Sequence, residues 1–232
     1  MIAAAGGEDS GLERAGALER LCGGYWYPVY AFIRRRGHSP EQAQDLTQEF
    51  FLRIMNGAFF ERANPEMGRF RSFLLGAVQN FLSDTNDRER SQKRGGGTPA
   101  LSLNFETGEL NYAREPWNTE TPERIFQRKW ARTLLDRVME SLSGEFAASG
   151  KLDVFNRIKG YLTGDGDVKY AELGAELNLS ESGVKSAIRR MRQRYRELLR
   201  AEVVSTVADP SEVDPELQFL LRAISTQSLD VR

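Results

Sequence analysis

A cluster of basic residues in the last quarter of this 232-residue chain is the first feature that could do chemistry. Seven lysines and arginines and only three acids lie between Glu181 and Glu202, although the formal net charge of the whole chain is −1. Val184, Ile188 and Met191 recur at helical spacing, which predicts a helix with one inward face. The residues left exposed on its first turns are then Ser182, Lys185, Ser186, Arg189 and Arg190. Lysine and arginine suit both phosphate oxygens and guanine edges, so this helix is predicted to contact DNA.

The residues just before this basic helix complete a DNA-binding motif. Leu173 and Leu177 anchor a short helix expected over 168–177, and residues 178–180 form a turn in which Ser180 is the N-cap of the next helix. The small residues expected to let another helix approach closely are Ala171, Gly174 and Ala175. A basic helix face alone is most often only solvated. The short helix, the capped turn and the basic second helix together favour a helix-turn-helix.

A second polar group lies on the helix expected over 39–55. Leu46, Phe50 and Ile54 are spaced i, i+4, i+8 and are expected to face the core. The candidates for binding a protein partner on this helix are Asp45, Leu46, Gln48, Glu49 and Arg53. The two carboxylates and the glutamine of this set lie within one helical turn of each other. Such a patch suits docking onto a partner helix, and the alternative is an ordinary solvated surface.

Farther along, a turn and a helix between Asn64 and Arg94 carry groups that suit an unpaired DNA strand. The candidates are Arg69, Arg71, Ser72, Asn80, Arg88, Arg90, Lys93 and Arg94. Taking a base out of the stack costs on the order of a few kcal/mol, so protein groups must capture it. The amide, hydroxyl and guanidinium groups of the first half could do so, while the basic residues of the second half would hold phosphates.

Nearly all of the chain is predicted to be helical, because apolar residues recur at helical spacing and no segment alternates convincingly. The expected fold is all-α, with two small helical domains joined by a flexible acidic linker. Helices are expected over 19–36, 39–55, 69–90, 123–143, 151–162, 168–177 and 181–202, with a short one after Pro210; the expected N-caps are Ser39, Thr121 and Ser180. Gly95, Gly96 and Gly97 mark the clearest boundary. The predicted divisions are residues 1–94, a linker over 95–122, residues 123–205 and an extension over 206–232.

Composition argues against several other classes. No apolar run reaches the roughly 20 residues that a bilayer span requires, and residues 1–11 do not read as a signal peptide, so a cytoplasmic protein without membrane contact is expected. One cysteine, Cys22, and one histidine, His38, cannot assemble an ordinary zinc site or a disulfide framework. The glycines at 95–97 lack the ending of a phosphate-binding loop. No catalytic residue, metal or cofactor is predicted.

The residues around these polar groups resemble a known family. Asp45-Leu46-Thr47-Gln48-Glu49 is similar to the core-polymerase-binding helix of bacterial sigma factors. The run from Gly68 to Leu75, together with Asn80, looks like their promoter-melting segment. These pieces, then a linker, then a helix-turn-helix, follow the order of the extracytoplasmic-function (ECF) sigma factors over residues 15–205. The end of the chain is similar to a branch of that class with an acidic C-terminal extension.

The resemblance implies that the protein directs core RNA polymerase to promoters and helps to open the −10 region. Sigma domain two would lie in residues 1–94 and sigma domain four in 123–205. The partners implied are promoter DNA and core polymerase, through the β′ clamp helices and the β flap, and an anti-sigma or other regulatory protein is left open. The helix-turn-helix would read the −35 element. The alternative is a helix-turn-helix regulator that acts without core polymerase.

Three features depart from the family pattern. Gly76 and Ala77 stand where housekeeping sigma factors carry a tryptophan pair that wedges the duplex open, which is usual for the ECF class and implies a narrower promoter choice. The connection from Ser143 to Val168 is longer than is typical of sigma domain four. Ala187 stands where many relatives have an arginine, which affects the expected −35 contacts.

The acidic extension predicts one more interaction. Its apolar stripe would consist of Leu217, Leu220, Leu221 and Ile224, beside the acids Asp209, Glu212, Asp214 and Glu216. So short an amphipathic helix is not stable alone and must dock on another surface. We expect it to pack on domain four or to reach back to domain two and damp DNA binding. The alternative is a helix that only completes a core.

Overall fold

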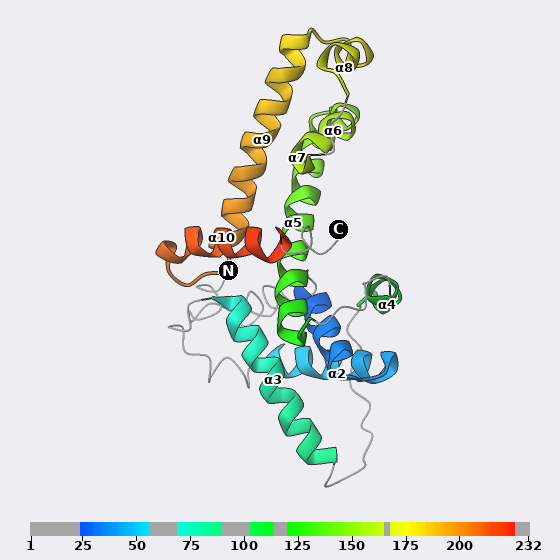
Figure 1. The fold of residues 1–232 in the computed structure, drawn as a ribbon, viewed down its shortest axis with the longest axis vertical. Helices are drawn as coiled ribbons and strands as arrows, with labels where there is room; N and C mark the ends of the chain where they lie inside the picture. Colours follow the sequence, from blue (N-terminus) through cyan, green and yellow to red (C-terminus); the bar gives the residue numbers. More distant parts are fainter. Residues whose placement is uncertain (1–23, 56–68, 90–102, 114–119, 165–167, 226–232) are drawn as a thin grey trace. The chain divides into compact units, whose positions relative to one another are not determined.

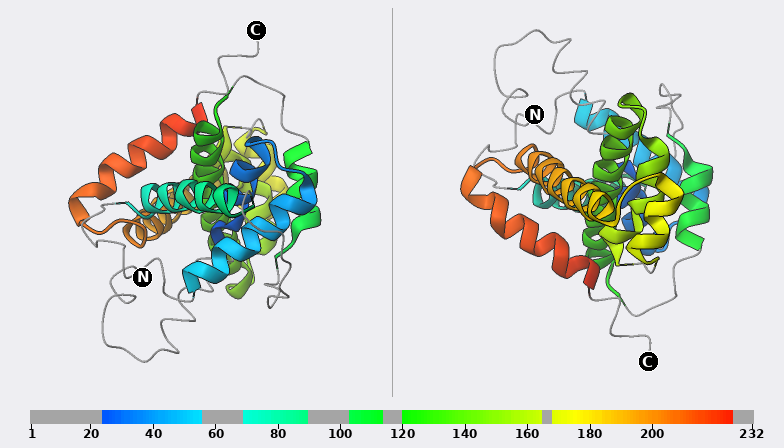
Figure 2. Two further views of the ribbon diagram at one scale, coloured as in Figure 1. Left: turned by 90° about the horizontal axis from the view of Figure 1, so that it is seen from below. Right: turned by 90° about the horizontal axis from the view of Figure 1, so that it is seen from above.

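The chain is helical throughout the part that the computed structural model describes, which is residues 24–55, 69–89, 103–113, 120–164 and 168–225 (Figure 1). A first helix covers 24–35, and the others are α2 Pro40–Met55, α3 Phe70–Glu89, α4 Phe105–Ala113, α5 Pro122–Ala148, α6 Leu152–Ile158, α7 Gly160–Thr163, α8 Tyr170–Leu177, α9 Glu181–Val204, the 3-10 turn η1 Pro210–Glu212 and α10 Val213–Ser225. Two further views show the same elements with no strand among them (Figure 2). An isolated bridge between Arg69 and Val207 is the sole β feature of the described ranges. The predicted all-α fold class is confirmed. Cys22 and the expected boundary at 95–97 lie outside the described residues.

Side-chain caps start three of the helices, as expected. The hydroxyls of Ser39, Thr121 and Ser180 accept hydrogen bonds from the backbone N–H groups of Gln42 (3.3 Å), Arg124 (3.3 Å) and Gly183 (3.1 Å). Each bond satisfies an N–H group that has no partner within its own helix. These starts are therefore determined locally, by the residues at the helix ends.

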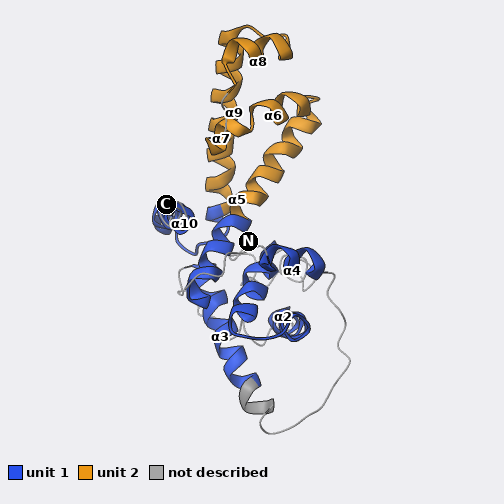
Figure 3. Cartoon of the chain, turned by 45° about the vertical axis from the view of Figure 1, so that its right-hand side comes forward, with its two compact units in different colours: residues 1–133, 203–232 blue, residues 134–202 orange. Residues whose placement is uncertain are grey.

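The described helices group into two compact units (Figure 3). Unit 1 comprises residues 1–133 and 203–232, and unit 2 comprises residues 134–202. The division falls inside α5 and α9, and not at the start of α5 as the predicted division at residue 123 had it. Ile125, Phe126 and Trp130 of the first half of α5 are buried in unit 1, at 4%, 0% and 0% exposure. A helix start is a local feature, whereas a unit boundary depends on which neighbours bury the apolar face.

Stacked aromatic rings fill the core of unit 1. The Trp130 ring lies 4.1 Å from that of Tyr25, centroid to centroid, with the planes 15° apart. The ring of Phe70, at the start of α3, lies 5.9 Å from Trp130 and 6.3 Å from Tyr25. Aromatic pairs at these separations add to the stability that burial alone provides. The cluster joins the first helix, α3 and α5, and it thereby fixes the beginning of α3.

Helix α4 lies within the segment that was expected to be a flexible linker, and it is docked in unit 1. The Phe105 ring packs 5.1 Å from Trp26 and 5.6 Å from Tyr30. Glu109 accepts two hydrogen bonds of 2.9 Å from Arg34 and one of 2.5 Å from the Tyr30 hydroxyl. The described part of the predicted linker is therefore not a free tether, because Phe105 and Glu109 both contact the first helix.

The ion pair at Glu109 predicts a change in the acid sensitivity of unit 1. Hydrogen bonds from Arg34 hold the pKa of Glu109 below its ordinary value. Its contribution to folding is therefore complete above the unfolded-state pKa of about 4.3 and is lost as pH falls through the lower folded-state value. Glu109→Gln should lower stability at neutral pH and flatten the loss of thermal stability on acidification. Glu106→Gln, an exposed acid of the same helix, is the control. Equal acid sensitivity of Glu109→Gln and the parent protein would contradict the prediction.

Unit 2 has a separate apolar core. Its buried members are Leu142, Phe155, Ile158, Tyr161, Leu173, Val184, Ile188 and Met191. They come from α5, α6, α7, α8 and α9, so every helix of the unit contributes to one core. α8 and α9 are the two helices of the predicted helix-turn-helix.

The turn between α8 and α9 depends on Gly174 and Asn178. Asn178 ends α8 in the left-handed conformation, with φ of 53°. The chain then folds back so closely that a Cβ on Gly174 would lie 2.6 Å from the carbonyl oxygen of Leu179. Ala171, Gly174 and Ala175 were predicted to let another helix approach closely, and this prediction is wrong. Ala171 and Ala175 are exposed, and the element that approaches Gly174 is the turn at Leu179. Only the glycine is required by close packing.

Two glycine substitutions should change the stability of unit 2 in opposite directions. Gly174→Ala should destabilise it by about 1–3 kcal/mol, because the added methyl group meets backbone that cannot easily move. Gly144→Ala adds the same group to α5, where nothing lies within 4 Å. It should stabilise the unit by about 0.5–1 kcal/mol by restricting the unfolded chain. Urea unfolding of both variants measures the difference, and shifts of equal sign would contradict the proposed packing.

Candidate nucleic-acid interface

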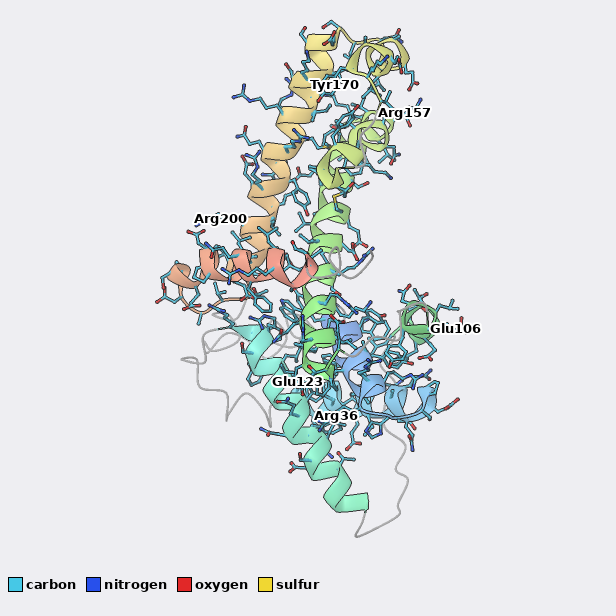
Figure 4. All side chains as sticks on the ribbon, in the orientation of Figure 1. Arg36, Glu106, Glu123, Arg157, Tyr170 and Arg200 are labelled. Atoms are coloured by element: carbon cyan, nitrogen blue, oxygen red, sulfur yellow. The ribbon has the colours of Figure 1, made fainter. Side chains whose placement is uncertain are left out.

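The first turns of α9 present the predicted DNA-binding side chains to solvent. Ser182, Lys185, Ser186, Arg189 and Arg190 are all exposed. The opposite face is buried, with Val184 at 0%, Ile188 at 3% and Met191 at 1% exposure. The helical periodicity read from the sequence therefore placed both faces correctly. Figure 4 shows the side chains that α9 carries along its length, from these turns to Arg200.

The basic residues of α9 fall into two groups by their contacts. Arg194 pairs with Glu145 at 2.8 and 2.7 Å, and Arg192 donates to the carbonyl of Tyr161 at 2.8 Å, so both hold unit 2 together. Arg189 and Arg190 form no ion pair with any residue that the structure describes. The count of seven basic residues thus overstates the charge available to a phosphate backbone, because Arg192 and Arg194 already have partners within unit 2.

Lys185 has a local partner. Its ammonium group lies 2.6 Å from a carboxylate oxygen of Glu181, one turn earlier. The hydrogen bond to Glu181 raises the pKa of Lys185 above its ordinary value, so the side chain stays protonated. An exposed pair of this kind is weak. Lys185 could therefore leave Glu181 and bind a DNA phosphate with little loss of free energy.

Ala187, one turn before Arg190, is not among the exposed residues of α9. It is half-buried and, with Phe146, Val154, Leu179 and Arg190 among others, lines an open apolar groove of about 370 Å³ in unit 2. The departure from the family pattern at this position therefore lies in the wall of a groove that Arg190 also lines.

Helix α2 carries the second predicted site. Asp45 is exposed, while Gln48, Glu49 and Arg53 are half-exposed. Arg53 forms an ion pair with Glu49 and lies 4.9 Å from the centre of the Phe81 ring. Leu46, also a candidate, is buried at 8% exposure and therefore packs in the core beneath these polar residues. The structure thus brings three acceptor side chains and one cation together on one side of α2.

The residues predicted on and after α3 differ in their accessibility. Ser72 and Asn80 are exposed, Arg69 is half-exposed, and Arg71 is buried at 5% exposure. Arg90, Lys93 and Arg94 lie outside the described residues, and the side chain of Arg88 is not described either. The two arginines at the start of α3 are the unexpected positions, because both are in contact with the C-terminal extension.

The extension docks in unit 1, which was one of the two surfaces expected for it. The backbone N–H of Phe70 donates to the carbonyl of Thr206 at 2.9 Å, beside the Arg69–Val207 bridge. Of the predicted apolar stripe, Leu220 is buried at 2% exposure, Leu217 and Ile224 are half-buried and Leu221 is 60% exposed.

The contacts that the sequence did not predict come from two acids and one ring. Glu212 accepts hydrogen bonds of 2.8 and 2.5 Å from Arg69. Glu216 accepts two from Arg71, at 3.0 and 3.2 Å, and the Arg71 guanidinium lies 3.6 Å from the centre of the Phe219 ring. The spacing of Arg69 and Arg71 and that of Glu212 and Glu216 were visible in the sequence, but nothing in it paired them.

The described ranges offer neither a metal site nor a membrane span. Acids, cysteines and histidines do not gather there in any group that could hold a metal ion. Among those same residues, every helix is too short or too polar to cross a membrane.

Comparison with known proteins shows what this arrangement is similar to. Residues 27–92 match the family model of sigma-70 region 2, and the match contains all of α2 and α3. Over 171 residues the chain is 29% identical to the ECF RNA polymerase sigma factor SigE of Mycolicibacterium smegmatis, covering 74% of this chain. The chain spans 57% of the length of that curated relative. No solved structure matches. These matches confirm the resemblance to the ECF sigma factors, and the region 2 match lies within unit 1; they do not extend to the branch with an acidic C-terminal extension.

Proposed function

We propose that this protein is an ECF-class sigma factor, which directs core RNA polymerase to specific promoters and helps to open the −10 region. The observation that carries the proposal is the sigma-70 region 2 match over a domain whose α2 patch is accessible. The helix-turn-helix in unit 2, with its basic first turns exposed, supplies a second DNA-binding element. A factor of this kind positions the polymerase and performs no catalysis itself, and it works where the polymerase is, in the cytoplasm.

The α2 patch is the proposed contact with the polymerase, on the β′ clamp helices. Polar side chains on one side of a helix whose other side is buried can change partners without cost to the core. Phe50 and Ile54 are 0% and 2% exposed, whereas Asp45 faces solvent. An anti-sigma protein that blocked the factor fully would have to cover this patch or the basic turns of α9.

Loss of two side chains from the patch should weaken polymerase binding. Gln48→Ala combined with Glu49→Ala should lower the affinity for core polymerase about tenfold, the cost expected for two central polar contacts. Fluorescence titration of labelled protein with core polymerase measures this. The matched control is Glu106→Ala with Asn111→Ala, which removes one acid and one amide from exposed positions of α4. Equal affinities in both variants, with thermal unfolding unchanged, would refute the assignment of the patch.

The first turns of α9 are the proposed reader of the −35 element. Lysine and arginine there can contact phosphates, but bidentate contacts to bases are what distinguish sequences. Arg190 is the residue best placed to test this, because it is exposed and carries no ion pair within the described part of the chain. The remainder of unit 2 would also contact the β flap of the polymerase.

Arg190→Ala should cost about 1–3 kcal/mol in promoter binding and relax the preference at one base pair. Arg196→Ala removes the same side chain from an exposed position farther along α9 and is the control. Selection of binding sequences by the polymerase complex of each variant measures both effects. A loss that is the same for every sequence would mean that Arg190 touches phosphate only.

A helix-turn-helix regulator that acts alone is the other candidate, and the region 2 match does not favour it. Such a regulator would bind its operator tightly without polymerase and would not co-purify with it. In vitro transcription with purified core polymerase, followed by sequencing of the opened DNA, separates the two functions and would identify the promoter.

A further inference from the structure

We infer that the C-terminal extension is a built-in competitor for nucleic-acid phosphate, with Glu212 and Glu216 occupying the guanidinium groups of Arg69 and Arg71. The inference rests on the proposed function, in which the start of α3 contacts DNA. It goes further in naming the residues that block this surface and the anion that must replace them. Contact of DNA with these two arginines then requires η1 and α10 to leave.

The first pair is open to exchange. Arg69 donates through Nε and Nη2 to a single oxygen of Glu212, and its Nε lies 3.4 Å from Glu216 as well. The side chains of Arg69 and Glu212 are 29% and 36% exposed, so water and other anions reach the pair. Arginine binds carboxylates and phosphates through the same N–H groups. A phosphate can therefore replace Glu212 without any rearrangement of Arg69.

The second pair is closed. Glu216 is 1% exposed and accepts from both Nε and Nη2 of Arg71, while the Phe219 ring covers the face of the same guanidinium. No donor on that edge is left for a strand of DNA. Separation of the two charges within the protein would leave Arg71 and Glu216 buried and unpaired, which is strongly unfavourable. Both charges must therefore become solvated or acquire new partners together, which makes release of α10 an all-or-none step.

The backbone at the start of α3 is blocked in the same way. A helix N-terminus offers unpaired N–H groups to anions, but here the Phe70 N–H already donates to Thr206, in the segment that leads into the extension. Ser72 and Asn80, which lie farther along α3, remain exposed. The extension thus covers the charged beginning of the helix and leaves its later polar positions open.

Few apolar side chains of α10 are fully buried, so the helix can be released. Val213 and Leu220 are buried at 1% and 2%, whereas Leu221 is 60% exposed and Leu217 is half-exposed. A helix of 13 residues is marginal without tertiary contacts. Docking therefore depends on few apolar contacts together with the two ion pairs, and polyanions compete directly with the ion pairs.

Neutralisation of one acid tests the competition. Glu212→Gln removes the half-exposed carboxylate and leaves the buried pair intact. The full-length variant should bind a fluorescein-labelled, random-sequence single-stranded oligonucleotide more tightly than the parent protein, by about three- to tenfold, because the competent state becomes more populated. Its dependence on salt should steepen by about 0.7 per arginine released. Glu106→Gln, which removes the same charge from exposed α4, should change neither quantity.

Two further variants make the outcome decisive. Leu220→Ala loosens α10 without a change of charge and should also tighten binding. Adding Arg69→Gln to the Glu212→Gln variant should abolish the gain. If Glu212→Gln and Leu220→Ala bind the oligonucleotide no more tightly than the parent, the extension is structural and the inference is overturned, while core polymerase binding through α2 would still stand. A protein that binds neither DNA nor polymerase in any form would overturn the proposed function as well.

Discussion

The stack of Trp130 on Tyr25 is the contact on which the rest of unit 1 depends. The rings lie 4.1 Å apart, and Phe70 packs against both from the first turn of α3. Arg69 and Arg71 flank Phe70 in the sequence, so the aromatic cluster that anchors Phe70 also determines where the two guanidinium groups emerge. A region 2 that would bind DNA thus has its charged residues positioned by a tryptophan from α5, a helix that the family match does not include.

A buried charge imposes the second constraint. Arg71 is 5% exposed and cannot remain there without an anion, and Glu216 supplies it. This dependence works in both directions, because Glu216 at 1% exposure equally requires Arg71. The extension is therefore tied to α3 by this ion pair as well as by its apolar face, of which Leu220 alone among the expected residues is fully buried. The apolar stripe alone therefore did not predict how the extension docks.

The sequence predicted what local residues determine. The helix-turn-helix, its exposed basic turns and the caps at Ser39 and Ser180 follow from spacing over a few residues, and all are found. Contacts between residues far apart in the chain could not be predicted from the sequence. Glu109 lies 75 positions from Arg34, and Glu216 lies 145 positions from Arg71. Periodicity indicates that a face is buried but not which element covers it, so the docking of α4 and the unit boundary within α5 could not be derived. The acids of the extension were recognised as a group, but their individual partners were not.

The extension belongs to the same polypeptide as the arginines that it contacts, and this has a consequence for its strength. A tethered ligand faces its site at an effective concentration set by the connecting chain, typically millimolar for short flexible links, and not by the amount of protein present. Glu212 follows the end of α9 by eight positions, and residues 203–232 belong to the same compact unit as α3, so Glu212 stays near its partner. Dilution cannot remove such a competitor, and higher expression of the protein cannot saturate it. Each molecule carries its own antagonist in fixed one-to-one proportion.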